Sequence, residues 1–192
     1  APELRLTTAV TLEAWVKPST ATNKWKDIVE KGNDNYFLMA TSAPNGRPAA
    51  GGIFNGVNTV AYGPTALAVN VWTHLAMTYN GSAIRLYVNG LEVSSVSRTG
   101  GIKTSRTPLQ IGGDNYYGQY FAGTIDEVRV YNRALTQVEI QADMIVPVAT
   151  PVPDGEPPTT AAALVASAFS GTQNNLSWVA ATDNVGVARY RV

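Results

Sequence analysis

The 192-residue sequence contains no cysteine and a single histidine, His74. Without cysteine there is neither a disulfide bond nor a thiol nucleophile, and a zinc site built from His and Cys has almost no ligands to draw on. A Ser-His-Asp triad would depend entirely on His74, whose neighbours alternate in character like a strand. We therefore expect His74 to lie on the face of a sheet rather than in a catalytic triad.

Charge is also scarce, at 15% of residues, and the 14 Lys and Arg are balanced by 14 Asp and Glu. A chain with no basic excess has no broad attraction for phosphate backbones or anionic lipid. No apolar run approaches the ~20 residues that a membrane-spanning helix needs. The composition therefore argues against nucleic acid as a partner and against membrane insertion.

What the sequence does have is 45% hydrophobic residues, 17 glycines and 11 prolines, which suits short strands joined by tight turns. Residues 11–17 (TLEAWVK) alternate with the period of a strand that has one face in a core, with Leu12, Ala14 and Val16 inward and Glu13 and Trp15 outward. Trp15 and Trp72 lie within strand patterns, which favours core packing for both.

Three further strands are indicated at residues 73–79, 82–88 and 91–96, separated by Asn80-Gly81 and Asn89-Gly90. Asn-Gly supplies the two positive φ values of a type I′ turn, whose twist matches antiparallel strands. The segment is therefore predicted to be an antiparallel meander.

The remaining elements are shorter. Strand patterns cover residues 27–31 and 35–40, which are predicted to pair, and residues 108–111 and 121–131. Thr136 followed by Glu139 fits a capping box, so a short helix is predicted over residues 136–143.

The composition changes after residue 146. Residues 147–158 contain five prolines and are predicted to form an extended linker between residues 1–146 and 159–192. The final segment has strand patterns at 164–169, 175–178 and 188–192. Three strands cannot cover both faces of a sandwich, so we expect this part to be incomplete and unstable by itself.

Four segments, at residues 11–18, 72–90, 109–114 and 122–136, together resemble the laminin-G-like group of the concanavalin A-like lectin/glucanase superfamily. The resemblance implies an all-β fold, a two-sheet antiparallel jelly-roll sandwich, with one short helix at its C-terminal end. Relatives usually begin with an extra strand carrying an acidic turn, and this sequence starts after it. Residues 159–192 look similar to the first half of a fibronectin type III domain.

The resemblance also implies a structural Ca²⁺ ion at Asp126, because the matching aspartate binds calcium in many relatives. Carboxylate and carbonyl oxygens are the ligands that Ca²⁺ prefers. The alternative is that Asp126 caps a turn or pairs with Arg129 or Arg133.

Because the superfamily contains glucanases, hydrolysis needs a test. Glycosidases use two carboxylates that flank one bond. Asp126 and Glu127 are adjacent and are expected to point to opposite faces of a strand, which does not suit that chemistry. A pair of Glu13 and Glu127 remains the alternative for a glycoside hydrolase.

Aromatic and polar residues mix in the predicted loops. Sugars stack their C–H faces on aromatic rings and pair their hydroxyls with Asp and Asn side chains. The predicted carbohydrate site comprises Trp25, Tyr36, Asp114, Asn115, Tyr116 and Tyr117. The alternative for each tyrosine is packing that merely holds its loop in place.

Taken with the resemblance, these features predict a non-catalytic, lectin-like carbohydrate-binding module of a secreted or cell-surface bacterial protein. Its expected partners are a polysaccharide or glycan and neighbouring modules of the same chain. A module for protein-directed adhesion, or a structural spacer, is the alternative.

Overall fold

The computed structural model describes residues 2–43, 45–148, 157–170 and 173–182. The chain divides into two units, residues 1–148 and 149–192, which are described separately. The strand predicted at residues 188–192 lies outside the described residues.

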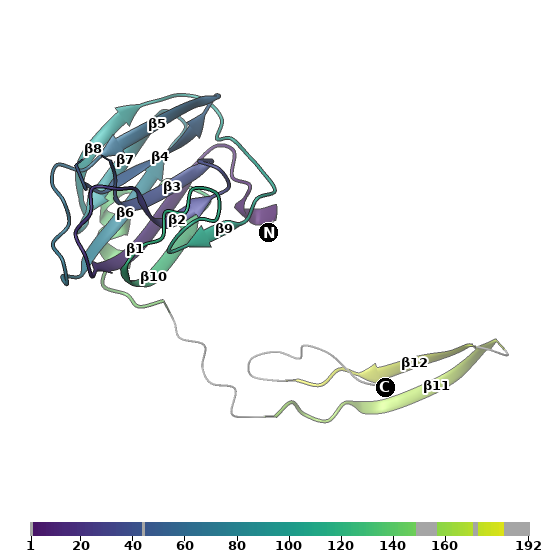
Figure 1. Cartoon of the computed structure of the whole chain (residues 1–192). Helices are drawn as coiled ribbons and strands as arrows, with labels where there is room; N and C mark the ends of the chain where they lie inside the picture. The colour runs from purple at the N-terminus through teal and green to yellow at the C-terminus, as the bar shows by residue number, and fades with distance from the viewer. Residues whose placement is uncertain (1, 44, 149–156, 171–172, 183–192) are drawn as a thin grey trace. The chain divides into compact units, whose positions relative to one another are not determined.

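The first unit is a sandwich of two antiparallel five-stranded sheets, which confirms the predicted jelly-roll architecture (Figure 1). The first sheet has the order β10-β1-β6-β7-β8. Its strands are Gly123–Tyr131 (β10), Val10–Pro18 (β1), Thr73–Tyr79 (β6), Ala83–Val88 (β7) and Leu91–Ser97 (β8). The second sheet has the order β5-β4-β3-β2-β9. Its strands are Val57–Tyr62 (β5), Ala49–Phe54 (β4), Tyr36–Thr41 (β3), Lys26–Lys31 (β2) and Leu109–Ile111 (β9).

The core lies between the two sheets and follows from the alternation seen in the sequence. Leu12, Ala14 and Val16 of β1 are fully buried and belong to one cluster with Leu38 of β3 and Leu86 of β7. Burying a side chain of this size contributes about 1.5–3 kcal/mol, so the two inner faces supply most of the stability of the unit. The outer faces of both sheets take no part in this core.

The two Asn-Gly turns of the meander differ from each other. Asn89 and Gly90 have φ values of 49° and 73°, as a type I′ turn requires. At the other turn only Gly81 has a positive φ, of 88°. There the Asn80 side-chain oxygen accepts hydrogen bonds from the backbone N–H groups of Ser82 and Ala83, at 3.0 and 2.9 Å. The side-chain amide therefore shapes a three-residue loop in place of the predicted two-residue turn.

The hairpin of β4 and β5 was not predicted, although its Asn55-Gly56 turn has φ values of 48° and 76°. The sequence of β4, AAGGIF, has one β-branched residue, Ile53, and two glycines, so its composition does not mark a strand. A Cβ atom at Gly51 would lie 2.4 Å from the Thr59 carbonyl oxygen and 2.8 Å from the ring of Phe37. Glycine is needed here because the backbone of β5 and the Phe37 ring leave no room for a side chain.

The α-helix α1, Gln137–Asp143, begins at the predicted capping box. The Thr136 side chain accepts from the Glu139 N–H, and the Glu139 side chain accepts from the Thr136 N–H. The helix packs on the outer face of the first sheet, where Ile140 contacts the cluster containing Ala76 and Tyr87. Apart from α1, a single 3-10 turn, Pro2–Leu4 (η1), is the other helical element among the described residues. No helix in the described ranges has the length and hydrophobicity to cross a membrane.

The described part of the second unit is one antiparallel hairpin of Ala162–Ser170 (β11) and Gln173–Val179 (β12). These strands contain the predicted segments 164–169 and 175–178. Leu164, Val165 and Val179 are each more than half exposed. A two-stranded ribbon with its apolar side chains in water is at best marginally stable.

Candidate functional site

The outer face of the second sheet carries aromatic residues. Alternation along β3 sends Leu38 into the core and places Phe37 and Met39 on the opposite face. There they contact Trp25, which precedes β2, and Val60 of β5. The face that a sandwich normally presents to water therefore carries an apolar strip across three strands.

The loop that follows β9 forms a wall beside this strip. Asp114 is fully buried, and its carboxylate accepts the backbone N–H groups of Tyr117 and Gln119, the latter at 3.2 Å. The Asp27 N–H of β2 donates to the Gln119 carbonyl at 2.9 Å, which fastens the loop to the sheet. A Cβ atom at Gly113, where φ is 151°, would lie 2.4 Å from the Tyr120 ring, so the loop closes this tightly because glycine is present.

Between the strip and the wall lies a groove of about 370 Å³. Its volume falls within the range of ~300–1,000 Å³ typical of small-molecule sites. Its lining mixes aromatic, apolar and polar side chains: Trp25, Asp34, Phe37, Met39, Asn58, Val60, Tyr62, Tyr117 and Gln119.

The aromatic side chains of the groove hold one another in place. The Trp25 ring lies 6.4 Å from Phe37 and 6.1 Å from Tyr62, measured between centroids. The Arg47 guanidinium lies 5.9 Å from the centroid of Tyr62. The Tyr117 hydroxyl donates to the Asp34 carboxylate at 3.0 Å. Fixed rings beside hydrogen-bonding groups suit a ligand that has both apolar faces and hydroxyls.

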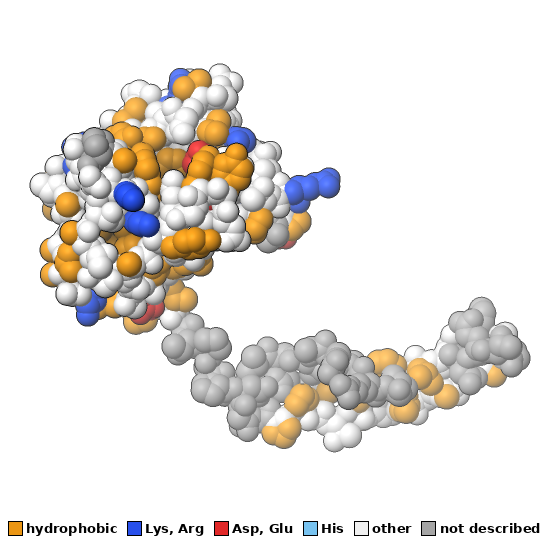
Figure 2. All heavy atoms as spheres, viewed as in Figure 1, with side chains coloured by type: hydrophobic (Ala, Val, Ile, Leu, Met, Phe, Trp, Pro, Cys, Tyr) orange, Lys and Arg blue, Asp and Glu red, His pale blue; other side chains and the backbone are white. Residues whose placement is uncertain are grey.

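Strong charge is absent from much of the visible surface. Figure 2 shows hydrophobic side chains in separate patches among uncharged polar atoms, with few basic or acidic groups on the face in view. This distribution agrees with the zero net charge of the sequence and favours an uncharged or weakly charged ligand.

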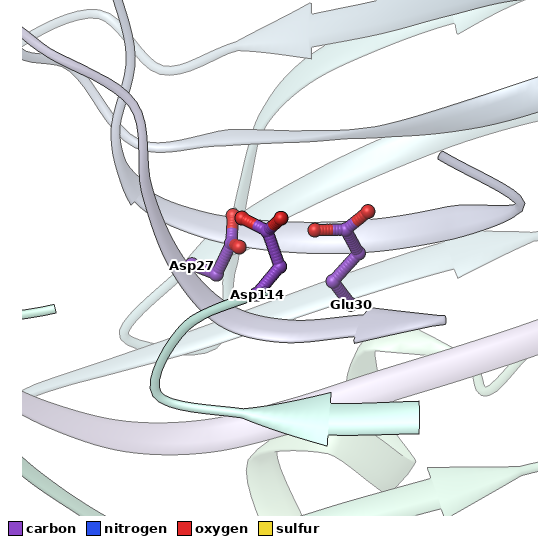
Figure 3. A group of neighbouring side chains, drawn as sticks. All are labelled: Asp27, Glu30 and Asp114. Atoms are coloured by element: carbon purple, nitrogen blue, oxygen red, sulfur yellow. The ribbon is translucent and has the colours of Figure 1, made fainter. Parts of the chain in front are cut away.

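A group of acidic side chains lies under the wall of the groove. Asp27 and Glu30 of β2 and Asp114 of the loop point their carboxylates toward one another, with one oxygen of each within 4.8 Å of the others (Figure 3). All three residues are fully buried. Both oxygens of Asp27 and one oxygen of Glu30 have no hydrogen-bond partner.

The electrostatics of the three carboxylates differ. Burial, together with the neighbouring acidic groups, raises the pKa of Asp27. Burial likewise raises the pKa of Glu30. Burial alone would raise the pKa of Asp114, but the adjacent Asp27 carboxyl and hydrogen bonds from the backbone of its own loop lower it. Three carboxyls this close cannot all be ionised without a counter-charge, so the group needs either a shared proton or a cation.

The outer face of the first sheet has a shallower hollow of about 330 Å³, lined by Trp15, Trp72, Asp126 and Glu127. The prediction that the two acidic side chains point to opposite faces is wrong. The pairing of β1 with β10 shifts at this point, and Glu127 has a φ of 53°, so the strand bulges and both side chains line the hollow.

Both acidic groups of this hollow already have partners. Glu127 forms an ion pair of 3.3 Å with Arg129 and accepts the backbone N–H of Val148. Asp126 accepts the Glu127 N–H at 2.8 Å. The prediction that Trp15 and Trp72 pack in the core is wrong. Both residues line the hollow on this outer face, and Trp72 is 41% exposed.

Under α1, the same sheet buries Glu13 and His74 completely. Burial and the nearby Asp143 raise the pKa of Glu13 to about 8. Burial and the Arg129 charge lower the pKa of His74 to about 4. Neither carboxyl oxygen of Glu13 has a hydrogen-bond partner. His74 lies on a sheet face as predicted, and its ring meets Trp15 edge-on at 5.5 Å.

Of the six predicted sugar-binding residues, the structure brings Trp25 and Tyr117 into one groove. Tyr116 is 67% exposed and packs edge-on against Tyr117 at 4.6 Å between ring centroids. Asn115 is exposed beside them and accepts the Tyr120 hydroxyl at 3.1 Å.

The other two predicted residues do not reach the groove surface. Tyr36 is 1% exposed and lies in the core between the sheets, where its hydroxyl donates to the Leu4 carbonyl at 2.8 Å. Asp114 is buried under the loop. Strand alternation could have identified Tyr36, because it shares a face with Leu38.

Sequence reasoning missed the sheet-borne part of the groove. Phe37 and Met39 stand at alternate positions of a predicted strand, so an outward apolar pair was visible in the pattern. Asn58, Val60 and Tyr62 belong to a strand that was not predicted. Asp27 and Glu30 face the same side because β2 bulges between them, which the sequence alone does not show.

A β-sandwich with an aromatic groove on one outer face defines a lectin-like class of domain. The sequence agrees: the chain belongs to the Laminin_G_3 family of the concanavalin A-like lectin/glucanases superfamily, whose model matches residues 1–141. Among curated proteins it is 38% identical over 78 residues to pappalysin-1 of Mus musculus and 54% identical over 43 residues to chitinase Chi52 of Paenibacillus xylanexedens. These matches cover 38% and 22% of the chain but only 5% and 8% of the relatives.

Solved structures share the fold. A putative carbohydrate binding protein from Bacteroides ovatus matches with a TM-score of 0.62 and 18% identity over 92% of this chain and 55% of that one. Domain 4 of AbnA, an extracellular arabinanase from Geobacillus stearothermophilus in complex with arabinotriose, gives 0.58 and 22% over 73% and 68%. The CBM40 of a Ruminococcus gnavus sialidase, bound to α2,3 sialyllactose, gives 0.57 and 18% over 74% and 85%.

Proposed function

We propose that the first unit is a non-catalytic carbohydrate-binding module and that the sugar lies in the groove on the outer face of the second sheet. The observation that carries this proposal is the combination of Trp25, Tyr62 and Tyr117 with Asp34 and Asn58 in one groove. Rings would stack on the C–H faces of a sugar, and the carboxylate and amides would accept and donate to its hydroxyls.

The neighbours support the class of ligand. Two of the matching structures contain arabinotriose or sialyllactose, as bound to those proteins. Because identities of 18–22% establish the fold alone, the sugar bound by this chain has to be found by experiment. An extracellular setting, as for the arabinanase, is proposed here on the same grounds.

The absence of catalysis is proposed from the acidic groups. A glycosidase needs one acidic and one ionised carboxyl on either side of the scissile bond. The alternative pair has little access to a sugar: Glu13 is fully buried, and Glu127 is engaged by Arg129 and by the Val148 N–H. The remaining carboxylate of that hollow, Asp126, accepts a backbone N–H.

Binding at one such groove is expected to be weak. An aromatic stacking contact contributes ~0.5–1.5 kcal/mol, and the groove offers few of them. Useful affinity would come from neighbouring modules on the same polysaccharide. We also propose that residues 159–192 are part of a fibronectin type III module. The β11–β12 hairpin and the resemblance of the sequence support this proposal.

The test is a glycan array followed by affinity electrophoresis on the best ligand. Tyr117→Ala should weaken binding about 2–10-fold, because it removes a ring worth ~0.5–1.5 kcal/mol. Tyr117→Phe is the matched control, since it keeps the ring and removes the hydroxyl bonded to Asp34. Equal retention of Tyr117→Ala and the parent would place the sugar elsewhere, and release of reducing sugar that Glu13→Gln abolishes would make the protein an enzyme.

A further inference from the structure

The carbohydrate-binding role does not account for the buried carboxylates under the groove wall. We propose that Asp27, Glu30 and Asp114 hold a Ca²⁺ ion, which ties the loop after β9 to strand β2. This site differs from the one that the family resemblance placed at Asp126. The ion site stands on geometry and burial, and only its effect on glycan binding rests on the proposed function.

The first observation is that three carboxylates converge and that no ion pair among the described residues neutralises them. One oxygen from each carboxylate lies within 4.8 Å of the others, and each of the three residues is 0% exposed. Across the described ranges, the ion pairs involve Arg85, Arg129 and Arg133, and none of them reaches this group. Lys31 of the same strand directs its ammonium to the carbonyls of Ser105 and Thr107. Within the described residues, no ion pair neutralises the three carboxylates.

The second observation is that fully buried oxygens point into the group without a partner. Both oxygens of Asp27 and Oε2 of Glu30 accept no hydrogen bond. Buried polar atoms in proteins are nearly always paired, and a charged one more stringently so. A bound cation would satisfy these atoms together.

The ligand type selects the ion. All three side chains offer carboxylate oxygen, which suits Ca²⁺ or Mg²⁺ rather than zinc with its preference for His and Cys. Mg²⁺ dehydrates reluctantly and usually keeps several waters, whereas Ca²⁺ accepts carboxylate cages of flexible geometry. Three fully buried carboxylates with oxygens within 4.8 Å of one another therefore suit Ca²⁺ better.

Asp114 and Glu30 are also hydrogen-bonded to residues that line the groove. Asp114 accepts the backbone N–H groups of Tyr117 and Gln119. Glu30 accepts the Asp34 N–H at 3.2 Å, and Asp34 in turn accepts the Tyr117 hydroxyl. An ion held by these carboxylates would therefore fix the side chains that line one side of the groove.

A shared proton is the competing explanation, and thermal unfolding of the full chain separates the two. Adding CaCl₂ to about 10 mM, well above the ~0.1–1 mM dissociation constants of extracellular calcium modules, should raise the melting temperature over that in chelator. Asp27→Asn and Glu30→Gln should remove this rise. In chelator, Asp27→Asn should melt no lower than the parent, since it removes a buried carboxyl group whose two oxygens have no hydrogen-bond partner.

Asp126→Asn is the matched control, because it removes the carboxylate that the resemblance assigns to calcium while leaving the buried group intact. It should keep the rise in melting temperature. No rise in the parent protein, or a rise that survives Asp27→Asn and disappears in Asp126→Asn, would overturn the proposal. Isothermal titration with CaCl₂ alone should give one binding event in the parent and none in Asp27→Asn.

Measurements of glycan binding distinguish this proposal from the function proposed above. If the groove binds no glycan, the melting shift with Ca²⁺ should still appear. If the ion site is wrong, the shift is absent while the effect of Tyr117→Ala on glycan retention remains. If both proposals hold, chelator should weaken glycan retention of the parent severalfold and leave that of Asp27→Asn unchanged.

Discussion

The two outer faces of the sandwich carry similar side chains but differ in how far other segments cover them. Each sheet sends alternate aromatic and acidic side chains outward, with Glu13 and Trp15 on one and Phe37 and Glu30 on the other. On the first sheet, α1 and the residues after it lie over much of that face: Trp15 donates to the Met144 carbonyl at 3.3 Å. On the second sheet the loop after β9 closes only one side, so a groove stays open.

The difference shows that strand periodicity alone does not decide which face can bind a ligand. What decides it is the segment that packs on top. The helix buries Glu13 and His74 with α1 residues around them, whereas the loop presents Tyr117 and Gln119 to the groove. Fully buried acids under a helix are structural, while aromatic rings beside a short wall can reach a ligand.

The largest effect is expected from opening the covered face. Ile140→Ala should lower the free energy of unfolding by about 2–5 kcal/mol, because Ile140 is 0% exposed and anchors α1 to the sheet. Val138→Ala on the same helix is the control, since Val138 is 74% exposed and should change stability by less than about 0.5 kcal/mol. Urea denaturation measures both, and equal losses would show that α1 does not depend on this contact.

A smaller effect on stability is expected from Glu13, which lies under α1 on the same face. Glu13 has a pKa of about 8 when folded, against an ordinary value of 4.5, so the folded state holds its proton more tightly and stability is lost as pH rises from about 4.5 to 8. Glu13→Gln mimics the protonated form and should add about 1–3 kcal/mol at pH 8 and almost nothing at pH 4.5. Glu3→Gln, at an exposed position, is the control for the loss of one acidic group. A constant difference at every pH would contradict the buried, unpaired state of Glu13.

Ionisation of His74 should give stability the opposite dependence on pH. Its pKa of about 4, below the ordinary 6.5, means that the folded state binds its proton less tightly, so stability is lost as pH falls from about 6.5 to 4. Glu13→Gln should therefore leave the acid limb of the stability profile in place while flattening the alkaline limb.

The smallest effect compares the faces directly. Tyr62 and Trp72 are 38% and 41% exposed, and each is an aromatic residue on the outer face of its sheet. Tyr62→Ala should weaken glycan retention about 2–10-fold through the loss of one ring, whereas Trp72→Ala should leave it unchanged. A reversal of this pattern would move the site to the covered face.

The sequence predicted most of the scaffold because strand alternation and capping are local. The meander, β1 and the Thr136 capping box all follow from residues within a few positions of one another. The groove was predicted only in part, through Trp25 and Tyr117, because part of its floor comes from β5, VNTVAY, whose apolar and polar residues do not alternate.

The acidic group could not be predicted from local patterns. It needs the bulge in β2 that puts Asp27 and Glu30 on one face, and the long-range closure that brings Asp114 over them. The same limit applies to Asp126 and Glu127, which a bulge in the β1–β10 pairing brings to one hollow. Bulges are set by pairing with distant strands, so alternation fails at these positions.

The central claim is that the open face of the second sheet is where a glycan binds. The most direct measurement is a two-dimensional ¹H–¹⁵N NMR titration of the chain with the oligosaccharide that ranks first on a glycan array. The account predicts that the amide signals of Asn58, Tyr62, Tyr117 and Gln119 and the indole signal of Trp25 shift with saturation. Shifts confined to Trp15, Trp72 and Asp126, or no shift with any glycan on the array, would contradict it.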